Sequence, residues 1–390
     1  MSKAIDYIII GNGIAGTTAA EAIRKSDPDG SIAIFSDEAY PFYARIRLPQ
    51  FLAGDVTLEK IVLKSDSWYQ EHNIDLHINE PVVDINPTQK LITTNTGGSC
   101  SYKKLLLATG SHSFVLPLKG IENEGVFTLR NIDDAIRIKE YIRGKKNAVI
   151  LGGGLLGLEV GKALICQGVE ITVIEYFDRL LPRQVDLAGS NMLKCMMEKI
   201  GYHFHLGLHA EEIIRENGKL KVLMHEGDVF EGDMVLVSAG VRPNLDLAEK
   251  AGVNIDKGII VDDHLKTSVD GIFAAGDLTQ HKERLYGIWP AAKQQGEIAG
   301  MNMAGVATEY TGSTVITALK VAGINLTSIG DIDLDNTKEC VVDIDNEHGT
   351  YKKYVMQESA LVGCILVGDT KDKKKIERAI IEKRSIDEVT

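Results

Sequence analysis

Two glycine-rich segments of this chain have the spacing G-x-G-x-x-G, which is typical of turns that hold the pyrophosphate of a dinucleotide. The first, Gly11–Gly16, follows the apolar run Ile8–Ile10, and the second, Gly152–Gly157, follows the apolar run Ala148–Leu151. The first glycine of such a turn permits the tight bend, the second lets backbone approach the phosphates, and the third lets helix pack on strand. The phosphates then lie at a helix N-terminus, where free N–H groups and the helix dipole favour anions. Two copies predict two bound dinucleotides, and therefore electron transfer between them.

Acidic residues follow the second strand of each predicted unit, where a ribose ligand is expected. In the first unit a helix is predicted over 14–25 and a strand over 32–35, and Ser36-Asp37-Glu38 comes next. In the second unit a helix is predicted over 155–167 and a strand over 170–174, and Glu175 ends that strand. A carboxylate there binds both ribose hydroxyls and repels a 2′-phosphate, so the second unit is predicted to use NADH rather than NADPH.

Three further buried strands are predicted to end in small or acidic residues. Leu105–Leu107 runs into Ala108-Thr109-Gly110, and Met234–Val237 runs into Ser238-Ala239-Gly240. The run 271–275 delivers Gly276 and Asp277 at its C-terminal end. Open α/β sheets bind their ligands at this end of the strands. Burying the Asp277 carboxylate without partners would cost on the order of several kcal/mol, so we expect it to bind a ligand.

Composition excludes several classes of function. A net charge of −12 over 390 residues argues against nucleic acid as a partner, because phosphate binding needs a clustered basic surface. The five cysteines show no C-x-x-C, and His203, His205 and His209 lack the carboxylate or thiol that would complete a metal site, so no metal is predicted. The N-terminal residues lead directly into a predicted strand and no apolar stretch could span a bilayer, so we expect a cytoplasmic protein that makes no contact with membranes.

The character of the sequence changes near residue 310. Alternating patterns predict strands over 338–344, 351–356 and 361–367, followed by a charged helix over 371–383. These elements predict a separate α+β cap domain over 310–390. The run Lys371, Lys373, Lys374 and Lys375 is either a docking surface for an acidic carrier protein or a solvated helix face.

Together these motifs resemble the flavoprotein reductases of the pyridine nucleotide–disulfide oxidoreductase superfamily. The resemblance covers nearly the whole chain and rests on the two glycine motifs, Ala108-Thr109-Gly110, Glu159 and the segment Ile272–Asp277. It implies an α/β fold with two Rossmann-like dinucleotide-binding domains, in which an inserted NAD domain splits the FAD domain, plus a small α+β C-terminal domain. The implied ranges are 1–112 and 241–309 for FAD, 113–240 for NAD and 310–390 for the cap.

The chain differs from many members of this superfamily in the loop after the first unit, which contains no cysteine. Members that reduce disulfides carry C-x-x-x-x-C after the first unit and others carry one cysteine there, but residues 39–56 contain none. The loop instead reads YPFYARIRLP, similar to NADH:rubredoxin reductases and to the N-terminal part of NADH-dependent nitrite reductase large subunits, and 319–323 and 362–369 strengthen this likeness. A disulfide relay is therefore excluded, and we expect the flavin electron-transfer half of such a subunit, without its iron–sulfur and siroheme domains.

The resemblance gives individual residues expected roles. It directs Arg45 to the FAD phosphates, with a solvated loop arginine as the alternative, and it places Asp37 on the FAD adenosine ribose, with Glu38 as its rival. Asp277 would accept hydrogen bonds from the ribityl chain, and Gln50 stands where related reductases often have a lysine. The full set of expected cofactor-binding residues is Gly11, Gly13, Ile14, Ala15, Gly16, Asp37, Glu38, Arg45, Val83, Ala108, Thr109, Gly110, Arg130, Gly152, Gly154, Leu155, Leu156, Gly157, Glu175, Gly240, Gly276, Asp277 and Pro290.

No side chain is expected to act as a catalytic acid or base, because the flavin carries the chemistry. Trp289 and Pro290 are predicted to open a helix whose N-terminus faces the flavin, and Trp289 either stacks near the nicotinamide or belongs to the core. Glu159 lies near the nicotinamide or is solvated, and Lys320 is a further candidate for either ring.

The expected function is transfer of a hydride from NADH to FAD, and then of single electrons to a small redox protein, rubredoxin being the first expectation. The alternatives are a flavin-only NADH oxidase, a reductase component for a nitrite reductase or oxygenase, and a partner-binding protein similar to apoptosis-inducing factor.

Overall fold

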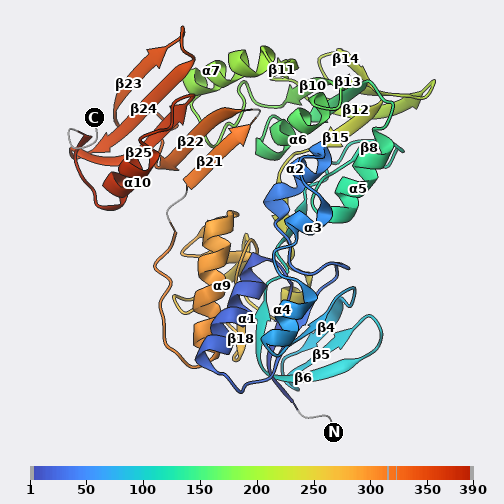
Figure 1. Ribbon diagram of the computed structural model, residues 1–390, viewed down its shortest axis with the longest axis vertical. Coiled ribbons are helices and arrows are strands. Elements are labelled where there is room, and N and C mark those ends of the chain that lie inside the picture. The colour runs from blue at the N-terminus through green and yellow to red at the C-terminus, as the bar shows by residue number, and fades with distance from the viewer. Residues whose placement is uncertain (1–3, 314–315, 322, 387–390) are drawn as a thin grey trace. The chain divides into compact units, whose positions relative to one another are not determined.

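The computed structural model describes residues 4–313, 316–321 and 323–386 (Figure 1). The chain divides into two compact units, each made of three stretches. The first unit comprises Met1–Arg45, Leu58–His112 and Val241–Ser313. The second comprises Ile46–Thr57, Ser113–Gly240 and Thr314–Thr390.

The first unit is built on a parallel sheet in the order β3-β2-β1-β6, with β18 also paired to β6. Strand β1 is apolar over Ile8–Ile10 because both faces of a parallel sheet are covered, and all three isoleucines are buried. The long strand β6 continues into an antiparallel meander with β5 and β4, and β17, β19 and β20 form a separate small sheet. The strands of this unit are β1 (Ile5–Ile10), β2 (Ile32–Phe35), β3 (Ile74–His77), β4 (Val82–Asn86), β5 (Leu91–Thr94), β6 (Ser99–Leu107), β17 (Ile259–Val261), β18 (Ile272–Ala274), β19 (Thr279–His281) and β20 (Arg284–Leu285).

Helices α1 and α9 of the first unit pack backbone against backbone. A Cβ atom at Gly296 would lie 2.2 Å from the carbonyl oxygen of Ala15, and one at Gly300 would lie 2.4 Å from that of Ala19. Both pairs are four residues apart, so small residues line the facing stripe of each helix. The helices of the unit are α1 (Ile14–Ser26), α3 (Leu58–Ile61), α4 (Asp66–Glu71), α8 (Asp246–Lys250) and α9 (Trp289–Met303).

We expect Gly300→Val to lower the free energy of unfolding by about 3 kcal/mol or more, because the added side chain must force α9 away from α1. Glu297→Val, on the exposed face of the same helix, should cost less than about 1 kcal/mol, the price of helix propensity alone. Urea unfolding followed by circular dichroism compares the two variants. Equal losses of stability would show that close packing at Gly300 is not required.

The second unit contains a parallel sheet in the order β11-β10-β9-β15-β8 and an antiparallel sheet of β12, β13 and β14. The helix predicted over 155–167 ends at Ile165, because Gly168 adopts a φ of +81° and Val169 donates to the Leu164 carbonyl at 3.1 Å. The elements are β8 (Val126–Phe127), α5 (Ile132–Tyr141), β9 (Asn147–Leu151), α6 (Leu155–Ile165), β10 (Glu170–Glu175), α7 (Leu187–Glu198), β11 (Tyr202–Leu206), β12 (Ala210–Glu216), β13 (Lys219–Met224), β14 (Val229–Gly232) and β15 (Met234–Val237). The connecting strands β7 (Ser111–Ser113) and β16 (Val241–Pro243) and the short 3-10 helix η1 (Arg45–Arg47) stand where the sequence passes between units.

The short helix α2 (Leu48–Ala53) groups with the second unit, although it lies within the range 1–112 that the sequence assigns to the FAD domain. Two side chains of the second unit hold its carbonyl groups. The Lys139 ammonium donates to the Phe51 carbonyl at 3.3 Å, and the Gln167 amide donates to the Leu52 carbonyl at 2.9 Å. Such long-range contacts cannot be read from local sequence pattern, and the assignment of domains to cofactors stays a prediction.

An antiparallel sheet in the order β21-β22-β25-β24-β23 follows near the C-terminus, with α10 against it. Strand β23 is shifted by one residue from the predicted range 338–344, and β24 and β25 extend the ranges predicted for them by one residue at one or both ends. The observed helix α10 is shorter than the predicted range 371–383. The Tyr351 hydroxyl donates to the Asp186 carboxylate at 2.6 Å, and the buried Lys353 ammonium lies 3.3 Å from that carboxylate. The elements are β21 (Ile316–Val321), β22 (Ile324–Gly330), β23 (Glu339–Asp345), β24 (Thr350–Gln357), β25 (Ala360–Val367) and α10 (Lys373–Ile381). These sheets agree with the predicted α/β class and α+β cap.

None of the helices in the described part of the chain is both long and apolar enough to cross a membrane.

Candidate functional site

The first glycine motif forms a tight turn that leaves space at the start of α1. Gly11 has a φ of +112°, and a Cβ atom there would lie 2.2 Å from the Ala108 carbonyl oxygen. A Cβ at Gly16 would lie 2.0 Å from the Gly11 carbonyl oxygen, so helix and strand approach too closely for any side chain. At Gly13 a Cβ would meet no described atom within 4 Å. The absence of a side chain at Gly13 therefore leaves open space, through which a ligand can approach the backbone.

The second motif repeats this geometry at the start of α6. Gly152 has a φ of +118° and its Cβ would lie 2.3 Å from the Ser238 carbonyl oxygen, while that of Gly157 would lie 2.5 Å from the Gly152 carbonyl oxygen. At Gly154 a Cβ again meets nothing within 4 Å among the described atoms. Neither Gly13 nor Gly154, the N-cap residues of the two helices, supplies a capping side chain. The first-turn N–H groups, which include those of Ile14, Ala15, Leu155 and Leu156, are thus suited to an anion.

The turns Gly11–Gly16 and Gly152–Gly157 form the first and the second nucleotide cradle. Glu175 lies beside the second cradle in a fixed orientation. Its side chain is buried, Oε2 accepts the Gly153 N–H at 2.6 Å, and Oε1 accepts the Phe177 N–H at 2.9 Å. A carboxylate has about four acceptor positions, so both oxygens can also accept ribose hydroxyls. The ribose role of Glu175 stays a prediction, and this geometry is compatible with it.

The two acidic candidates of the first unit differ in environment. Glu38 is half-buried and forms an ion pair with Arg45, and it accepts the Tyr43 hydroxyl at 2.5 Å. Asp37 is exposed. The Arg45 guanidinium also lies over the Tyr43 ring, 5.1 Å from its centroid, so Arg45 is held in place within the first unit. Asp37 as ribose ligand and Arg45 as phosphate ligand stay predictions.

The C-terminal ends of β6 and β18 bring Asp277 beside the residues 108–111. Asp277 Oδ2 accepts the Ser111 hydroxyl at 2.7 Å, a contact that the sequence did not indicate. The Asn244 amide donates to the Thr109 carbonyl at 2.7 Å, and the Gly276 N–H donates to the Gln295 side chain at 2.9 Å. Ser111 therefore orients the carboxylate that is predicted to hold the ribityl chain.

Tyr69 connects two sides of the first cradle and was missed by sequence reasoning. Its hydroxyl accepts the Phe42 N–H at 3.2 Å and donates to Asn12 Oδ1 at 2.9 Å. Asn12 Nδ2 is buried without a hydrogen-bond partner among the described residues. No local pattern marks Tyr69, because its partners lie far away in sequence.

Trp289 packs against the core of the first unit. It is half-buried and stacks on Phe42, with ring centroids 5.9 Å apart and planes 25° apart. These contacts agree with the alternative that Trp289 belongs to the core. Stacking of Trp289 near the nicotinamide stays a prediction. Pro290 is exposed at the start of α9.

The other predicted residues lie at strand ends or helix starts. Val83 is exposed on β4, and its carbonyl accepts the Lys250 ammonium at 2.8 Å. Arg130 lies before α5 in the second unit, and Gly240 follows β15 with a φ of +100°. The side chain of Lys320 lies outside the described residues.

The histidines form no metal centre with their neighbours in the part of the chain that the structure describes. His203 and His205 are exposed on β11, while His209 Nδ1 lies 2.8 Å from the Glu226 carboxylate. The lysines at 371, 374 and 375 are exposed at and before the start of α10.

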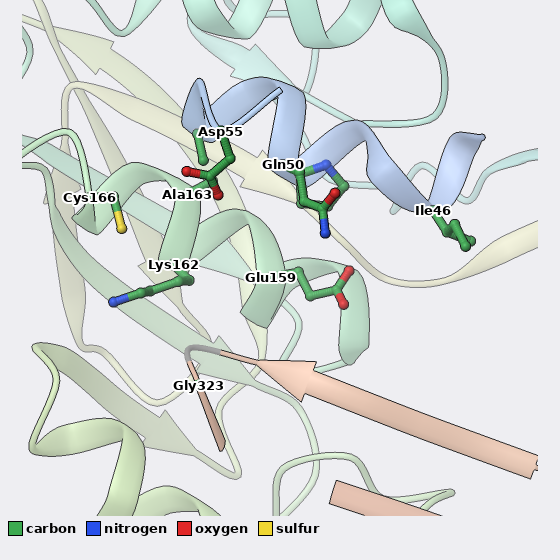
Figure 2. A pocket seen from close by; sticks show the side chains of 10 residues that line it. Ile46, Gln50, Asp55, Glu159, Lys162, Ala163, Cys166 and Gly323 are labelled. Carbon is green, nitrogen blue, oxygen red and sulfur yellow. The ribbon is translucent and has the colours of Figure 1, made fainter. Parts of the chain in front are cut away.

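Glu159 is half-buried on α6, where it lines a cavity together with Gln50 (Figure 2). Burial raises the pKa of its carboxyl group to about 7. The packing of α2 on α6 thus withdraws the side chain partly from water, and the place of Glu159, near the nicotinamide or in solvent, stays a prediction.

Two family models match the sequence. One, described as pyridine nucleotide-disulphide oxidoreductase, matches residues 5–296, and the other, rubredoxin NAD+ reductase C-terminal domain, matches residues 316–384. The chain belongs to the pyridine nucleotide-disulphide oxidoreductase family.

The chain is also similar to individual proteins of known sequence and structure. The chain is 34% identical to the NAD(P)H nitrite reductase of Bacillus subtilis over 98% of its own length, but spans 48% of that protein. It is 30% identical to the NADH-rubredoxin oxidoreductase of Clostridium acetobutylicum over 100% of its own length and 97% of the relative. The crystal structure of NADH:rubredoxin oxidoreductase from Clostridium acetobutylicum superposes with a TM-score of 0.82 at 28% identity, covering 99% of this chain and 97% of that one.

The resemblance and the fold class predicted from the sequence are thus confirmed, and the chain is a flavoprotein oxidoreductase whose cofactors are FAD and NAD(H). Both cradles fit these cofactors, because each has an open second glycine and the first adds a buried amide without a partner. The chain spans about half the length of the two Bacillus subtilis relatives that it matches.

Proposed function

We propose that this oxidoreductase passes electrons from NADH to a small electron-carrier protein, with rubredoxin as the expected carrier. The observation that carries the proposal is the pairing of two nucleotide cradles with a loop, residues 39–56, that contains no cysteine. Without a thiol in this loop, the loop cannot relay electrons as a disulfide. The match of residues 316–384 to a rubredoxin reductase C-terminal domain supports a carrier of this type.

FAD supplies, when bound, an acceptor for hydride and a donor of single electrons. The chain would hold it in the first unit, where the N–H groups at the start of α1 bind phosphate, and Asp277, oriented by Ser111, accepts hydrogen bonds from the ribityl chain. Arg45 would add a charge-assisted contact to the phosphates.

The second unit would hold NADH through the start of α6 and the Glu175 carboxylate. No side chain has to donate or remove a proton during hydride transfer, so the contribution of these residues is to position the two nucleotides. Glu175 would also set the preference for NADH, because its charge repels a 2′-phosphate.

The test is anaerobic oxidation of NADH by the FAD-loaded protein, with and without rubredoxin, followed through the loss of rubredoxin colour. We expect fast bleaching that requires the enzyme. Prompt flavin reduction without bleaching would overturn rubredoxin as the acceptor and keep the NADH step. Rapid NADH consumption in air without any carrier would instead favour an NADH oxidase, and slow flavin reduction with a long-lived NAD complex would favour a partner-binding role.

A second candidate is a reductase component that feeds a separate nitrite reductase module. It is favoured by the 34% identity to the Bacillus subtilis nitrite reductase, of which this chain spans 48%. Adding a purified siroheme module in place of rubredoxin to the same anaerobic assay separates the two candidates.

We expect turnover with rubredoxin to weaken as salt is added. Rubredoxins are generally acidic and the net charge of this chain is −12, so docking needs a local basic surface, for which the lysines at 371, 374 and 375 are candidates. The KM for rubredoxin should rise several-fold between low and high ionic strength, and Lys374→Gln should raise it at low salt. Lys25→Gln, an exposed lysine on α1, is the matched control. A KM that falls or stays constant with salt would contradict electrostatic docking.

A further inference from the structure

A buried polar cluster, formed by Asp186, Tyr351 and Lys353, joins the C-terminal sheet to helix α7 within the second unit. Helix α7 lies against β24 and β25 (Figure 1). The Asp186 carboxylate, at the N-cap of α7, accepts the Gly189 N–H at 3.0 Å. It also accepts the Tyr351 hydroxyl at 2.6 Å and lies 3.3 Å from the Lys353 ammonium. The function proposed so far assigns nothing to this cluster.

Lys353 places a positive charge where water hardly reaches it. The residue is 2% exposed, and its ammonium donates to the Asp333 carbonyl at 3.2 Å. Among the described residues, Asp186 supplies the carboxylate that pairs with it. Removing a charge from water is costly, and the cost is offset only when a partner is held in good geometry. The Lys353 ammonium therefore fixes the Asp186 carboxylate, and with it the start of α7, against β24.

The segment 180–186, which leads into α7, begins at the second cradle. The Leu181 N–H donates to the Gly153 carbonyl at 3.1 Å. The Leu180 side chain lies so close to the turn that a Cβ atom at Gly153 would be 2.7 Å from it. The Leu180 N–H donates to the Ser190 hydroxyl of α7 at 2.8 Å. The segment thus contacts the glycine turn at one end and belongs to the buried polar cluster at the other.

Leu181 has a strained backbone conformation within this segment. Its φ is +49°, in the left-handed region that a bulky side chain rarely adopts, and the residue is fully buried. Strain of this kind persists only where the surrounding structure fixes it, and it is common at ligand-binding sites. The Leu181 carbonyl accepts the N–H groups of Gln184 at 2.9 Å and Val185 at 3.1 Å. The place of Leu181, and so its hydrogen bond to Gly153, therefore depends on how the chain is anchored at Asp186.

We propose that Tyr351 and Lys353 are positioning residues for the nicotinamide nucleotide. By holding Asp186 they keep the segment 180–186 in place, and through Leu181 they keep the second cradle in the form that binds the pyrophosphate. The inference rests on the proposed function, in which that cradle holds NADH. Binding is tighter when the donors are already arranged, so a cradle that loses its support has to be ordered by the nucleotide itself. No contact between these two side chains and the nucleotide is required.

The first experiment uses Tyr351→Phe, which removes only the hydroxyl that donates to Asp186. We expect the Kd for 1,4,5,6-tetrahydro-NAD, an NADH analogue that cannot transfer hydride, to rise about 3- to 10-fold, a size typical of residues that act through a network. Isothermal titration calorimetry of the oxidised, FAD-loaded protein measures this Kd. The KM for NADH should rise in parallel, whereas kcat should change less than about twofold, because the chemical step itself is not altered.

Tyr354→Phe is the matched control on the same strand. The Tyr354 side chain packs with Ile376 and Ala379 of α10, and so belongs to a different cluster. This variant should leave the Kd for the analogue unchanged, and neither variant should change the affinity for FAD, which is proposed to lie in the first unit. A Kd that Tyr351→Phe leaves unchanged, whatever its stability in urea, or that Tyr354→Phe raises equally, would overturn the proposal. Failure of the unsubstituted protein to bind the analogue would instead overturn the proposed function.

A double-mutant cycle tests the path through the segment. Ser190→Ala removes the acceptor of the Leu180 N–H. Because Ser190→Ala and Tyr351→Phe release the same segment, their combined rise in Kd should be smaller than the product of the two single effects. The pair Asp186→Asn with Lys353→Met removes both buried charges together, keeps an acceptor at the N-cap of α7, and should raise the Kd at least as much as Tyr351→Phe. Independent effects in the cycle, or an unchanged Kd in the variant without the two charges, would contradict the assignment.

Discussion

Gly154→Ala is expected to weaken NADH binding by about 10- to 100-fold while the unfolding of the nucleotide-free protein stays unchanged. The φ of Gly154 is −79°, which alanine adopts readily, and its Cβ would meet no described atom within 4 Å. The added methyl group instead occupies the space through which the pyrophosphate approaches the backbone. Overpacking of this kind costs about 1–3 kcal/mol, which corresponds to the stated loss of affinity.

Gly152→Ala is the matched contrast two residues earlier. Its φ of +118° disfavours alanine, and its Cβ would lie 2.3 Å from the Ser238 carbonyl oxygen. We expect a loss of about 3 kcal/mol or more in the free energy of unfolding, because the clash is with backbone. Isothermal titration calorimetry with 1,4,5,6-tetrahydro-NAD, whose ring cannot transfer hydride, measures the loss of nucleotide affinity. Urea unfolding measures the loss of stability. Tight nucleotide binding by Gly154→Ala would refute the second cradle as the pyrophosphate site.

Glu175→Ala is expected to lower kcat/KM for NADH by about 100-fold. The change removes the predicted acceptor of the ribose hydroxyls and leaves the N–H groups of Gly153 and Phe177 without their carboxylate, at about 1–3 kcal/mol for each group. Activity with NADPH should fall much less, because the repulsion of its 2′-phosphate is removed at the same time.

Steady-state kinetics with both nucleotides measures this change of preference. Glu170→Ala, at the exposed start of the same strand, is the control and should leave both values unchanged. An equal loss with NADH and NADPH would mean that Glu175 serves only to support the Gly153 turn, and that the preference for NADH lies elsewhere.

The cradles show why a sequence motif can predict a site in detail. The turns require a positive φ at Gly11 and Gly152, and close contact between backbone atoms at Gly16 and Gly157. Each requirement involves only a few neighbouring residues, and glycine is the residue that meets it. The strands β1 and β9 were predictable for a similar reason, because burial on both faces demands an unbroken apolar run.

The burial and the partners of individual side chains, in contrast, could not be predicted from the local sequence pattern. Sequence alone left Glu159 either near the nicotinamide or in solvent, and only the packing of α2 on α6 shows that it is half-buried in a cavity with Gln50. The pairing of Glu38 with Arg45 likewise separates it from Asp37, although the two acids are adjacent in sequence.

The sequence by itself thus determined the family, the two cradles and the cysteine-free loop, because these depend on residue identity at fixed local spacing. The tertiary structure alone decided how Ser111 orients Asp277, how Tyr69 joins Phe42 to Asn12, and which unit holds α2. The physical reason is that hydrogen bonding and burial are set by residues far apart in the chain, which only folding brings within bonding distance.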